Sequence, residues 1–593
     1  MMRIGVILLF ATSALAGPEE EVQILLNAWQ VEQAAIKIEP LLAAMPEIPA
    51  IQAAAARVKF HQQRYADALD LMRRAKVTSG RSPGQYELIR ATFETTKNFV
   101  RHSGGRVVLR MSPGADEVLV PYLLKALNQA IDVLAPRFGV KITAPISVGI
   151  YPSAEAFSAV STLDMKSIKT SGTIALCKFD RLMLISPRAT LRGYDWLDTL
   201  SHELIHLLIS RRSHNTVPVW LHEGLAKYHE SGWRKPFGEP LPVNSAALLA
   251  RALNRDELIT FAQMSPSMAY LPSQEATATA FAEVHTAVEY LLEKYGEKSI
   301  LLLLDGLRDS GGDLDFAFRQ VSGAGLASFE RSWAIWLKGR RFETRDGLRV
   351  QALTFGKNRA ASDDDDPARP EGEAGRFARL GDLLFRRGHR QAAAIEYARS
   401  VKRAGYGYPG LVQRLASSQI ASGQLKEAGE VLKLSAERSP DDPRIHVLLG
   451  RLAVKAERFE QALDAYALAN AINPFDPEVH EGMRIAAKAL KRQPLIDQET
   501  KALAFLHAPP NVKAVVKRDQ PHGFLSVTTS PWSEVIIDDE SLHRASPLSD
   551  YPLSVGAHKL TLRNSALSLE RHLDVMITLG QTTIVKVDLR NDK

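Results

Sequence analysis

Apolar and polar positions follow two different periods along this chain, and the changes of period divide it into segments. Apolar residues recur every three to four positions from residue 20 to about 99 and again from 376 to about 508, as in amphipathic helices. Between these segments, residues 106–111 and 146–151 alternate like strands on either side of an amphipathic helix over 117–138. Near the C-terminus apolar residues recur at every second position, as in strands. The pattern predicts a multidomain protein with helical, α+β and all-β parts.

Residues 199–209 are predicted to form an apolar helix, which contains the sequence HELIH. Residues four apart share one face of a helix, so His202 and His206 can hold one metal ion between two imidazoles. Glu203, about 100° round the same helix, can reach a water bound to that metal. The alternative is that both histidines are core residues hydrogen-bonded to a buried glutamate.

A second motif, WLHEGLA over residues 220–226, favours the metal interpretation. It begins another predicted helix, whose Glu223 can supply an oxygen ligand. Two histidines, a glutamate and an open fourth position are typical of a catalytic zinc, whereas four protein ligands indicate a structural one. His222 points to another face of its helix, so we interpret it as a packing residue or a partner of a ligand.

Together HELIH and WLHEGLA resemble the gluzincin metallopeptidases, in particular the bacterial peptidase-MA-like group. The resemblance covers about residues 104–340 and implies an α+β gluzincin-like peptidase domain, which we place at 101–345. It also implies that Zn²⁺ is the cofactor and that peptide bonds are hydrolysed. The metal ligands are then His202, His206 and Glu223, and the general base is Glu203.

One position departs from the family pattern. The family often carries Tyr and Ser where this chain has Phe281 and Val284, and a tyrosine there would donate a hydrogen bond to the developing oxyanion. Phe281 has no donor. Tyr228 and His285 are substitutes by position, and each is equally compatible with an ordinary buried side chain.

Helical segments on both sides of this domain resemble tetratricopeptide repeats. Residues 17–100 contain one repeat-like stretch. From 376 to 508 the period is clear, because small residues and a terminating proline recur 34 residues apart: Ala416, Ala428 and Pro440, then Gly450, Ala462 and Pro474. About three such units predict an α-helical solenoid. Its concave surface either binds a peptide or protein partner or serves as a spacer.

Two other segments have their own composition. Residues 346–375 include four consecutive aspartates, which favour a solvated acidic linker over a calcium site. Residues 521–593 read as short strands joined by tight turns. Ser546-Pro547, the Val-Gly-x-His of residues 555–558 and a terminal Val-x-Leu resemble a PEGA domain, a small β-sandwich of bacterial envelope proteins. The resemblance implies an interaction module that carries no chemistry.

The first 16 residues resemble a cleavable secretory signal. Arg3 precedes a short apolar stretch, which ends in the small-residue sequence Ala14-Leu15-Ala16. That stretch is too short for a membrane anchor. Cys177 is the only cysteine, which excludes an intramolecular disulfide. We expect export to a bacterial periplasm, the cell envelope or the medium, with no transmembrane span in the mature chain.

Composition narrows the classes of function. The 593 residues are 45% apolar and 24% charged, as in globular proteins, and the net charge of +7 is spread along the chain, so we expect no nucleic-acid partner. Two functions remain. The first is an exported zinc metallopeptidase acting on a peptide or protein. The second, favoured by Phe281 and the binding modules, is a non-catalytic envelope scaffold with a metal-binding or degenerate peptidase-like domain.

Overall fold

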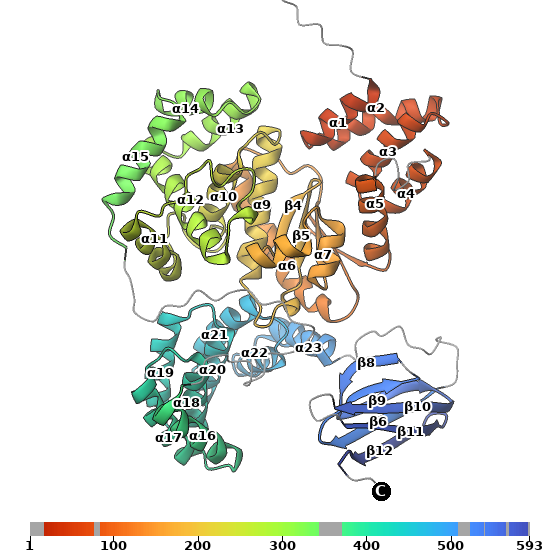
Figure 1. Ribbon diagram of the computed structural model, residues 1–593, viewed down its shortest axis with the longest axis vertical. Helices are drawn as coiled ribbons and strands as arrows, with labels where there is room; N and C mark the ends of the chain where they lie inside the picture. Colours follow the sequence, from red (N-terminus) through yellow and green to blue (C-terminus); the bar gives the residue numbers. More distant parts are fainter. Residues whose placement is uncertain are drawn as a thin grey trace, which may run out of the picture. The chain divides into compact units, whose positions relative to one another are not determined.

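The computed structural model describes residues 17–75, 83–342, 370–507, 522–538, 540–564 and 569–590 (Figure 1). The predicted signal over residues 1–16 and most of the predicted acidic linker, with its four aspartates, lie outside the described residues. The chain forms two compact units, Met1–Leu506 and His507–Lys593, and each is described by itself.

The larger unit begins with helices whose small residues let them pack closely. Ala34, Ala54 and Ala68 are fully buried in their common core, together with Phe60 and Tyr65. The repeat-like stretch lies over the end of α3, the turn after it and α4. The helices are α1 (Pro18–Asn27), α2 (Val31–Ala44), α3 (Pro49–His61), α4 (Tyr65–Arg74) and α5 (Pro83–Thr96).

A five-stranded sheet follows, with the strand order β1-β2-β3-β5-β4. The strands are β1 (Val100–Gly104), β2 (Val107–Met111), β3 (Ile146–Tyr151), β4 (Ala175–Lys178) and β5 (Arg181–Ile185). β2, β3 and β5 are parallel, and β4 runs antiparallel to β5 at one edge of the sheet. The predicted strands at 106–111 and 146–151 are present, whereas β1 was not predicted.

Alternate side chains of these strands pack against helices on opposite faces of the sheet. Leu182 and Leu184 share a core with α6 (Val120–Arg137) and α9 (Trp196–Ser213). Met183 and Ile185 lie in a second cluster with residues of α7 (Ala154–Val160) and α8 (Met165–Ser171). Short 3-10 helices precede α6 and α9, at Ala115–Leu119 and Pro187–Ala189. One face of the sheet therefore supports α9.

More helices complete this region, and one glycine sets their spacing. A Cβ on Gly224 would lie 2.7 Å from the backbone oxygen of Val284, so α10 and α12 approach closely only because that position has no side chain. Another 3-10 helix spans Met268–Tyr270. The helices are α10 (Val219–His229), α11 (Val243–Arg255), α12 (Gln274–Tyr295), α13 (Lys298–Ser310), α14 (Leu314–Ser322) and α15 (Leu326–Lys338).

The predicted solenoid has four helix pairs in the described residues, where the sequence indicated about three units. α18, α20 and α22 begin at Pro409, Pro443 and Pro477, so the 34-residue period is present. The first helix begins at Gly372, inside the predicted linker. The helices are α16 (Gly372–Arg386), α17 (Arg390–Ala404), α18 (Pro409–Ala421), α19 (Leu425–Arg438), α20 (Pro443–Lys455), α21 (Phe459–Ile472), α22 (Pro477–Ala489) and α23 (Gln493–His507).

The smaller unit consists of two sheets with a common core. Their strand orders are β11-β10-β7-β8 and β12-β6-β9. Leu560 from the first sheet and Leu525 from the second are fully buried in one cluster. The strands are β6 (His522–Ser530), β7 (Glu534–Ile537), β8 (Glu540–Ala545), β9 (Leu548–Ser554), β10 (Gly556–Asn564), β11 (Leu569–Ile577) and β12 (Thr582–Asp588). The predicted fold class of helical, α+β and all-β parts is therefore confirmed.

One of the described helices, Ala115–Arg137, is long and apolar enough to cross a membrane, and half of its most apolar window is buried. Its residues Leu123, Leu127 and Ile131 lie in the core shared with the sheet. Its apolar character is therefore explained by packing in the core.

Candidate metal centre

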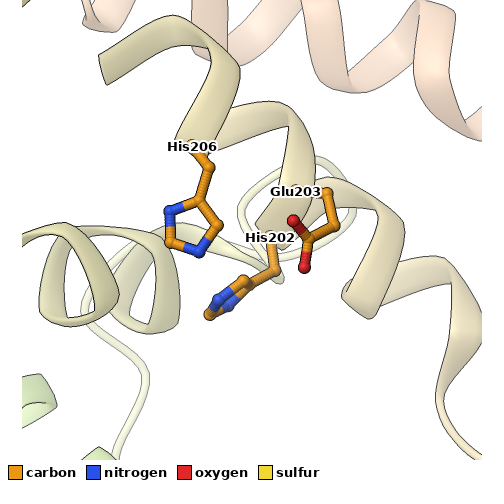
Figure 2. A group of neighbouring side chains, drawn as sticks. All are labelled: His202, Glu203 and His206. Carbon is orange, nitrogen blue, oxygen red and sulfur yellow. The ribbon is translucent and has the colours of Figure 1, made fainter. Parts of the chain in front are cut away.

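The candidate metal centre is built on α9, a helix most of whose side chains are buried. Leu204 and Ile205 are fully buried, as are Leu207, Leu208 and Ile209. The Asp195 carboxylate caps the helix by accepting the Asp198 N–H at 3.2 Å. With the helix fixed in this way, His202, Glu203 and His206 are neighbours, and their ligand atoms all lie within 4.8 Å of one another (Figure 2).

Glu223 of α10 completes this group. Its Oε2 lies 3.1 Å from His202 Nε2 and 3.4 Å from His206 Nε2. Zinc bonds of about 2.0–2.2 Å in tetrahedral geometry place ligand atoms about 3.4 Å apart, so these spacings match two edges of a zinc tetrahedron. The donor set of two imidazoles and one carboxylate thus fits zinc.

Charge in the centre favours a cation. Burial alone would raise the pKa of the Glu223 carboxyl, but His206 and His202 outweigh it and hold that pKa well below its usual value. Burial likewise opposes a charge on His202, but hydrogen bonds to Glu223 and Glu230 raise its pKa to about 10. These carboxylates therefore stabilise positive charge where a metal ion would be held.

The second ring nitrogen of His202 also has a partner. Its Nδ1 lies 3.1 Å from Glu230 Oε2, and Lys227 donates to the other Glu230 oxygen at 2.5 Å. Burial would raise the pKa of Glu230, but Lys227 and His202 lower it to about 2, so this carboxylate is ionised. It accepts a hydrogen bond from the Nδ1–H of His202, which leaves Nε2 as the nitrogen that can bind a metal.

His206 is oriented by a different chain of hydrogen bonds. Its Nδ1 lies 2.5 Å from His222 Nδ1, and His222 Nε2 lies 3.2 Å from the Ser210 hydroxyl, which donates to Asn215 Oδ1. Burial, reinforced by repulsion from His206, holds the pKa of His222 well below its usual value. The neutral His222 ring can therefore accept a hydrogen bond from the Nδ1–H of His206. His222 is thus a partner of a ligand, one of the two roles expected from the sequence.

Glu203 lies beside the ligands with one oxygen unoccupied. Burial raises the pKa of its carboxyl, and His206, His202 and a hydrogen bond from the Cys177 N–H act in the opposite direction. Its Oε2 is buried and has no hydrogen-bond partner in the described part of the chain. A buried carboxylate oxygen normally has a partner, and a water on a metal held by the neighbouring residues would supply one.

The two substitute oxyanion donors contact each other. The Tyr228 ring lies 5.3 Å from the His285 ring, and burial, reinforced by Glu289, raises the pKa of the Tyr228 hydroxyl. His285 is 7% exposed, and burial, reinforced by repulsion from Lys227, lowers its pKa to about 4. As oxyanion donors both stay predictions, because no contact of either with the ligands is found among the described residues.

Phe281, where the sequence led us to expect a donor, lies beside His202. Its ring centroid is 6.2 Å from that of His202. The centre therefore has an apolar ring at this position.

Sequence reasoning missed Glu230 and Lys227. Glu230 follows Glu223 by seven residues, two helical turns, and Lys227 lies midway, so the three share one helix face. That spacing was a usable signal. Nothing in the spacing, however, indicates that this face is turned toward His202.

Two family models match parts of the chain. Residues 126–339 match the family model of the Peptidase MA superfamily, and residues 419–485 match that of the tetratricopeptide repeat. No curated protein matches the chain. The resemblance of residues 521–593 to a PEGA domain stays a prediction.

Solved structures share low similarity with the chain. A thermophilic tetratricopeptide-repeat protein of Thermus thermophilus is 22% identical over 24% of this chain and 78% of its own, with a TM-score of 0.22. MamA of Desulfovibrio magneticus is 20% identical over 23% of this chain and 78% of its own, with a TM-score of 0.22. Native yeast LTA4 hydrolase is 11% identical over 68% of this chain and 66% of its own, with a TM-score of 0.27. These scores carry no argument about function. By its family matches, the chain contains a Peptidase MA superfamily domain together with tetratricopeptide repeats.

Proposed function

We propose that this chain is an exported zinc metallopeptidase that hydrolyses peptide bonds. The observation that carries the proposal is the spacing of His202 Nε2, His206 Nε2 and Glu223 Oε2, at 3.1 and 3.4 Å, beside the unpaired oxygen of Glu203. A core pair of histidines needs one acceptor each. Here the two Nε2 atoms lie close to the same carboxylate oxygen, at spacings that three ligands of one metal ion would have.

The residues divide the chemistry among them. Zinc held by His202, His206 and Glu223 would polarise the peptide carbonyl and lower the pKa of a water. Glu203 removes a proton from the attacking water and returns it to the leaving amine. Burial raises the pKa of its carboxyl, which suits a group that both accepts and donates a proton.

The edge strand β4 offers a place for the substrate backbone. Leu176 and Lys178 are opposite Met183 and Arg181 of β5, and Ile185 donates to the carbonyl of Ile174, so alternate residues of β4 bond to β5. The backbone N–H and C=O groups of Ala175 and Cys177 then point away from β5, toward the open edge of the sheet. The Cys177 N–H bonds to the Glu203 carboxylate, so a peptide that pairs with the remaining backbone groups of this edge lies next to Glu203.

The remaining parts of the proposal rest on sequence. The signal-like residues 1–16 support export to the periplasm, the envelope or the medium. The tetratricopeptide repeats support binding of a protein partner, and the C-terminal β-sandwich supports a second binding surface.

The test combines zinc analysis with digestion of a peptide library. We expect the purified full chain to contain about one zinc per chain and to cleave library peptides. Glu203→Gln should keep the zinc and lower kcat by about 10²–10⁴-fold, because only the base is lost. Glu257→Gln, which changes an exposed carboxylate, should alter neither quantity. Undiminished cleavage by Glu203→Gln would contradict the proposal.

A non-catalytic envelope scaffold is the second candidate, and the apolar Phe281 ring at 6.2 Å from His202 favours it. On this alternative the chain binds zinc but cleaves no library peptide, because no side chain stabilises the oxyanion. Mass spectrometry of the library after prolonged incubation separates the two candidates.

A further inference from the structure

A cavity of about 400 Å³ lies between the N-terminal helices and the edge strand β4. Arg57, Phe60 and His61 of α3 line one side of it. Cys177 and Lys178 of β4 line another, together with side chains from α1 and α5. The cavity is therefore formed where the helical N-terminal region meets the peptidase domain.

Among the described residues, basic side chains and no acidic ones line this cavity. None of its lining residues is an aspartate or glutamate, whereas Arg57, His61 and Lys178 are all basic. Arg57 Nε and His61 Nδ1 are buried and have no hydrogen-bond partner in the described residues. Burial, reinforced by Arg181, lowers the pKa of His61 to about 4, so at neutral pH its ring is uncharged and can donate one hydrogen bond.

A buried arginine behind the cavity wall adds to this charge. Arg181 is 1% exposed, and its guanidinium lies 4.9 Å from the ring centroid of Phe60 and 5.3 Å from that of Phe179, both of which line the cavity. It donates to the Tyr65 hydroxyl, while its Nε and Nη2 have no partner in the described chain. Asp180 does not balance it, because Arg211 holds both oxygens of that carboxylate at 2.9 Å.

Cys177 connects the cavity with the metal centre. This residue lines the cavity, and its N–H bonds to the Glu203 carboxylate. Phe179, two residues further along the chain, also lines it. Two residues of extended chain span about 7 Å, so a peptide lying along β4 reaches the cavity about two to three residues from the bond that Glu203 serves.

We infer that this cavity binds a carboxylate of the peptide substrate, so that the enzyme prefers substrates with an acidic group a few residues from the scissile bond. Arg57 and His61 donate to that carboxylate. The carboxylate comes either from a glutamate or aspartate side chain or from the substrate's C-terminus. This inference rests on the proposed peptidase function and adds its substrate class.

Kinetics test the preference. A peptide found to be cleaved in the library is resynthesised with glutamate or glutamine at each of four positions on either side of the scissile bond, and with a free or amidated C-terminus. At one position we expect a kcat/KM about tenfold higher for the acidic peptide, mainly through KM, since the contact lies away from the reacting atoms. If amidation removes the higher kcat/KM, the bound carboxylate is the substrate's C-terminus. If the Glu-to-Gln change removes it, the bound carboxylate is a side chain.

Arg57→Gln should lower this ratio to near one. Arg74→Gln, an exposed arginine of the same helical region paired with Asp70, should retain it. Unfolding midpoints of both variants show whether the N-terminal helices remain folded, and His61→Gln gives a second test if Arg57→Gln unfolds. A ratio near one in the wild type, or an unchanged ratio in both cavity variants, would overturn the inference.

Binding gives a readout that does not need turnover. Fluorescein-labelled decapeptides that differ only by glutamate or glutamine are titrated into zinc-loaded Glu203→Gln protein, and anisotropy gives their dissociation constants. We expect about tenfold tighter binding of the acidic peptide, lost on adding Arg57→Gln. This preference with no cleavage by the wild type would refute the peptidase function but not the carboxylate site. Equal binding of both peptides would refute the site itself.

Discussion

At the scale of single residues, the partners of the two histidine ligands differ in charge. His202 forms a hydrogen bond to the ionised Glu230 at 3.1 Å, whereas His206 forms one to the neutral His222. A charged acceptor makes the imidazole a stronger ligand than a neutral acceptor does. His202 should therefore depend more strongly on its partner for binding zinc.

Glu230→Gln tests this dependence. The amide keeps the shape of the side chain but removes the negative charge, so we expect zinc affinity to fall by about 10–100-fold. Competition with a chelator of known affinity measures the change. Glu239→Gln is the control, because this exposed carboxylate pairs only with Lys235 among the described residues. Equal affinities of Glu230→Gln and wild type would show that Glu230 does not orient His202.

Glu283 of α12 affects stability rather than the metal centre. Its carboxyl is fully buried and accepts the Ile259 N–H at 3.0 and 3.1 Å, and burial raises its pKa to about 8. Between pH 4.5 and about 8 the folded chain keeps a proton that the unfolded chain has lost. The free energy of unfolding therefore falls as pH rises through this window, by up to about 1.4 kcal/mol per pH unit from this group.

Glu283→Gln should remove this pH dependence, because the amide keeps an acceptor for Ile259 and cannot ionise. We expect the variant to be more stable than wild type near pH 8 and the two to converge near pH 4, where the carboxyl is protonated in both states. Urea unfolding at several pH values measures the difference. A constant difference at all pH values would contradict a raised pKa for Glu283.

The candidate ligands could be proposed from the sequence, whereas most of their hydrogen-bond partners could not. The spacing of His202 and His206 is local, because four residues on a helix always return to the same face. Their partners depend on how α9 and α10 pack, and that arrangement is set by tertiary contacts such as Gly224 on Val284. Local periodicity contains no information about such contacts.

At the scale of elements, the spacing of α10 and α12 decides where Glu223 lies. A methyl group on Gly224 would meet the Val284 backbone oxygen at 2.7 Å, and backbone cannot move away as a flexible side chain can. Gly224→Ala should therefore push α10 outward and carry Glu223 away from His202 and His206.

For Gly224→Ala we expect a loss of about 1–3 kcal/mol in the free energy of unfolding from overpacking, and weaker zinc binding as well. Gly429→Ala is the matched control, since a Cβ there meets only the Leu452 side chain at 3.6 Å. Denaturant unfolding and chelator competition measure the two effects. A destabilised variant with normal zinc affinity would show that the position of Glu223 does not depend on this contact.

Elements with a strong period were predicted well. The solenoid helices begin 34 residues apart, and β3 spans the residues expected for it. β1 was missed because its sequence, VRHSG, is polar and its strand lies at a sheet edge with alternate residues exposed. The fourth repeat pair was underestimated for another reason, since terminal repeats depart from the consensus.

At the scale of the whole larger unit, the repeats and the peptidase domain share buried polar contacts. The Trp196 indole, at the start of α9, donates to the Asn470 carbonyl at 3.0 Å. The Tyr122 hydroxyl of α6 donates to Glu499 at 2.7 Å, and His480 Nδ1 lies 2.6 Å from the other oxygen of the same carboxylate. His480 and Glu499 are both fully buried. The repeats therefore help to hold α9 in place.

Glu499→Ala tests whether the two parts unfold together. The change leaves Tyr122 and His480 buried without their acceptor, at a cost of about 1–3 kcal/mol for each group. Because these groups belong to α6 and α22, we expect amide hydrogen exchange to become faster in the peptidase domain as well as in the repeats. Glu481→Ala, at a largely exposed carboxylate paired with Arg484, should leave both regions unchanged. Faster exchange confined to the repeats would mean that they are attached to the peptidase domain without stabilising it, and the support of α9 would then come from the sheet and helices of the peptidase domain.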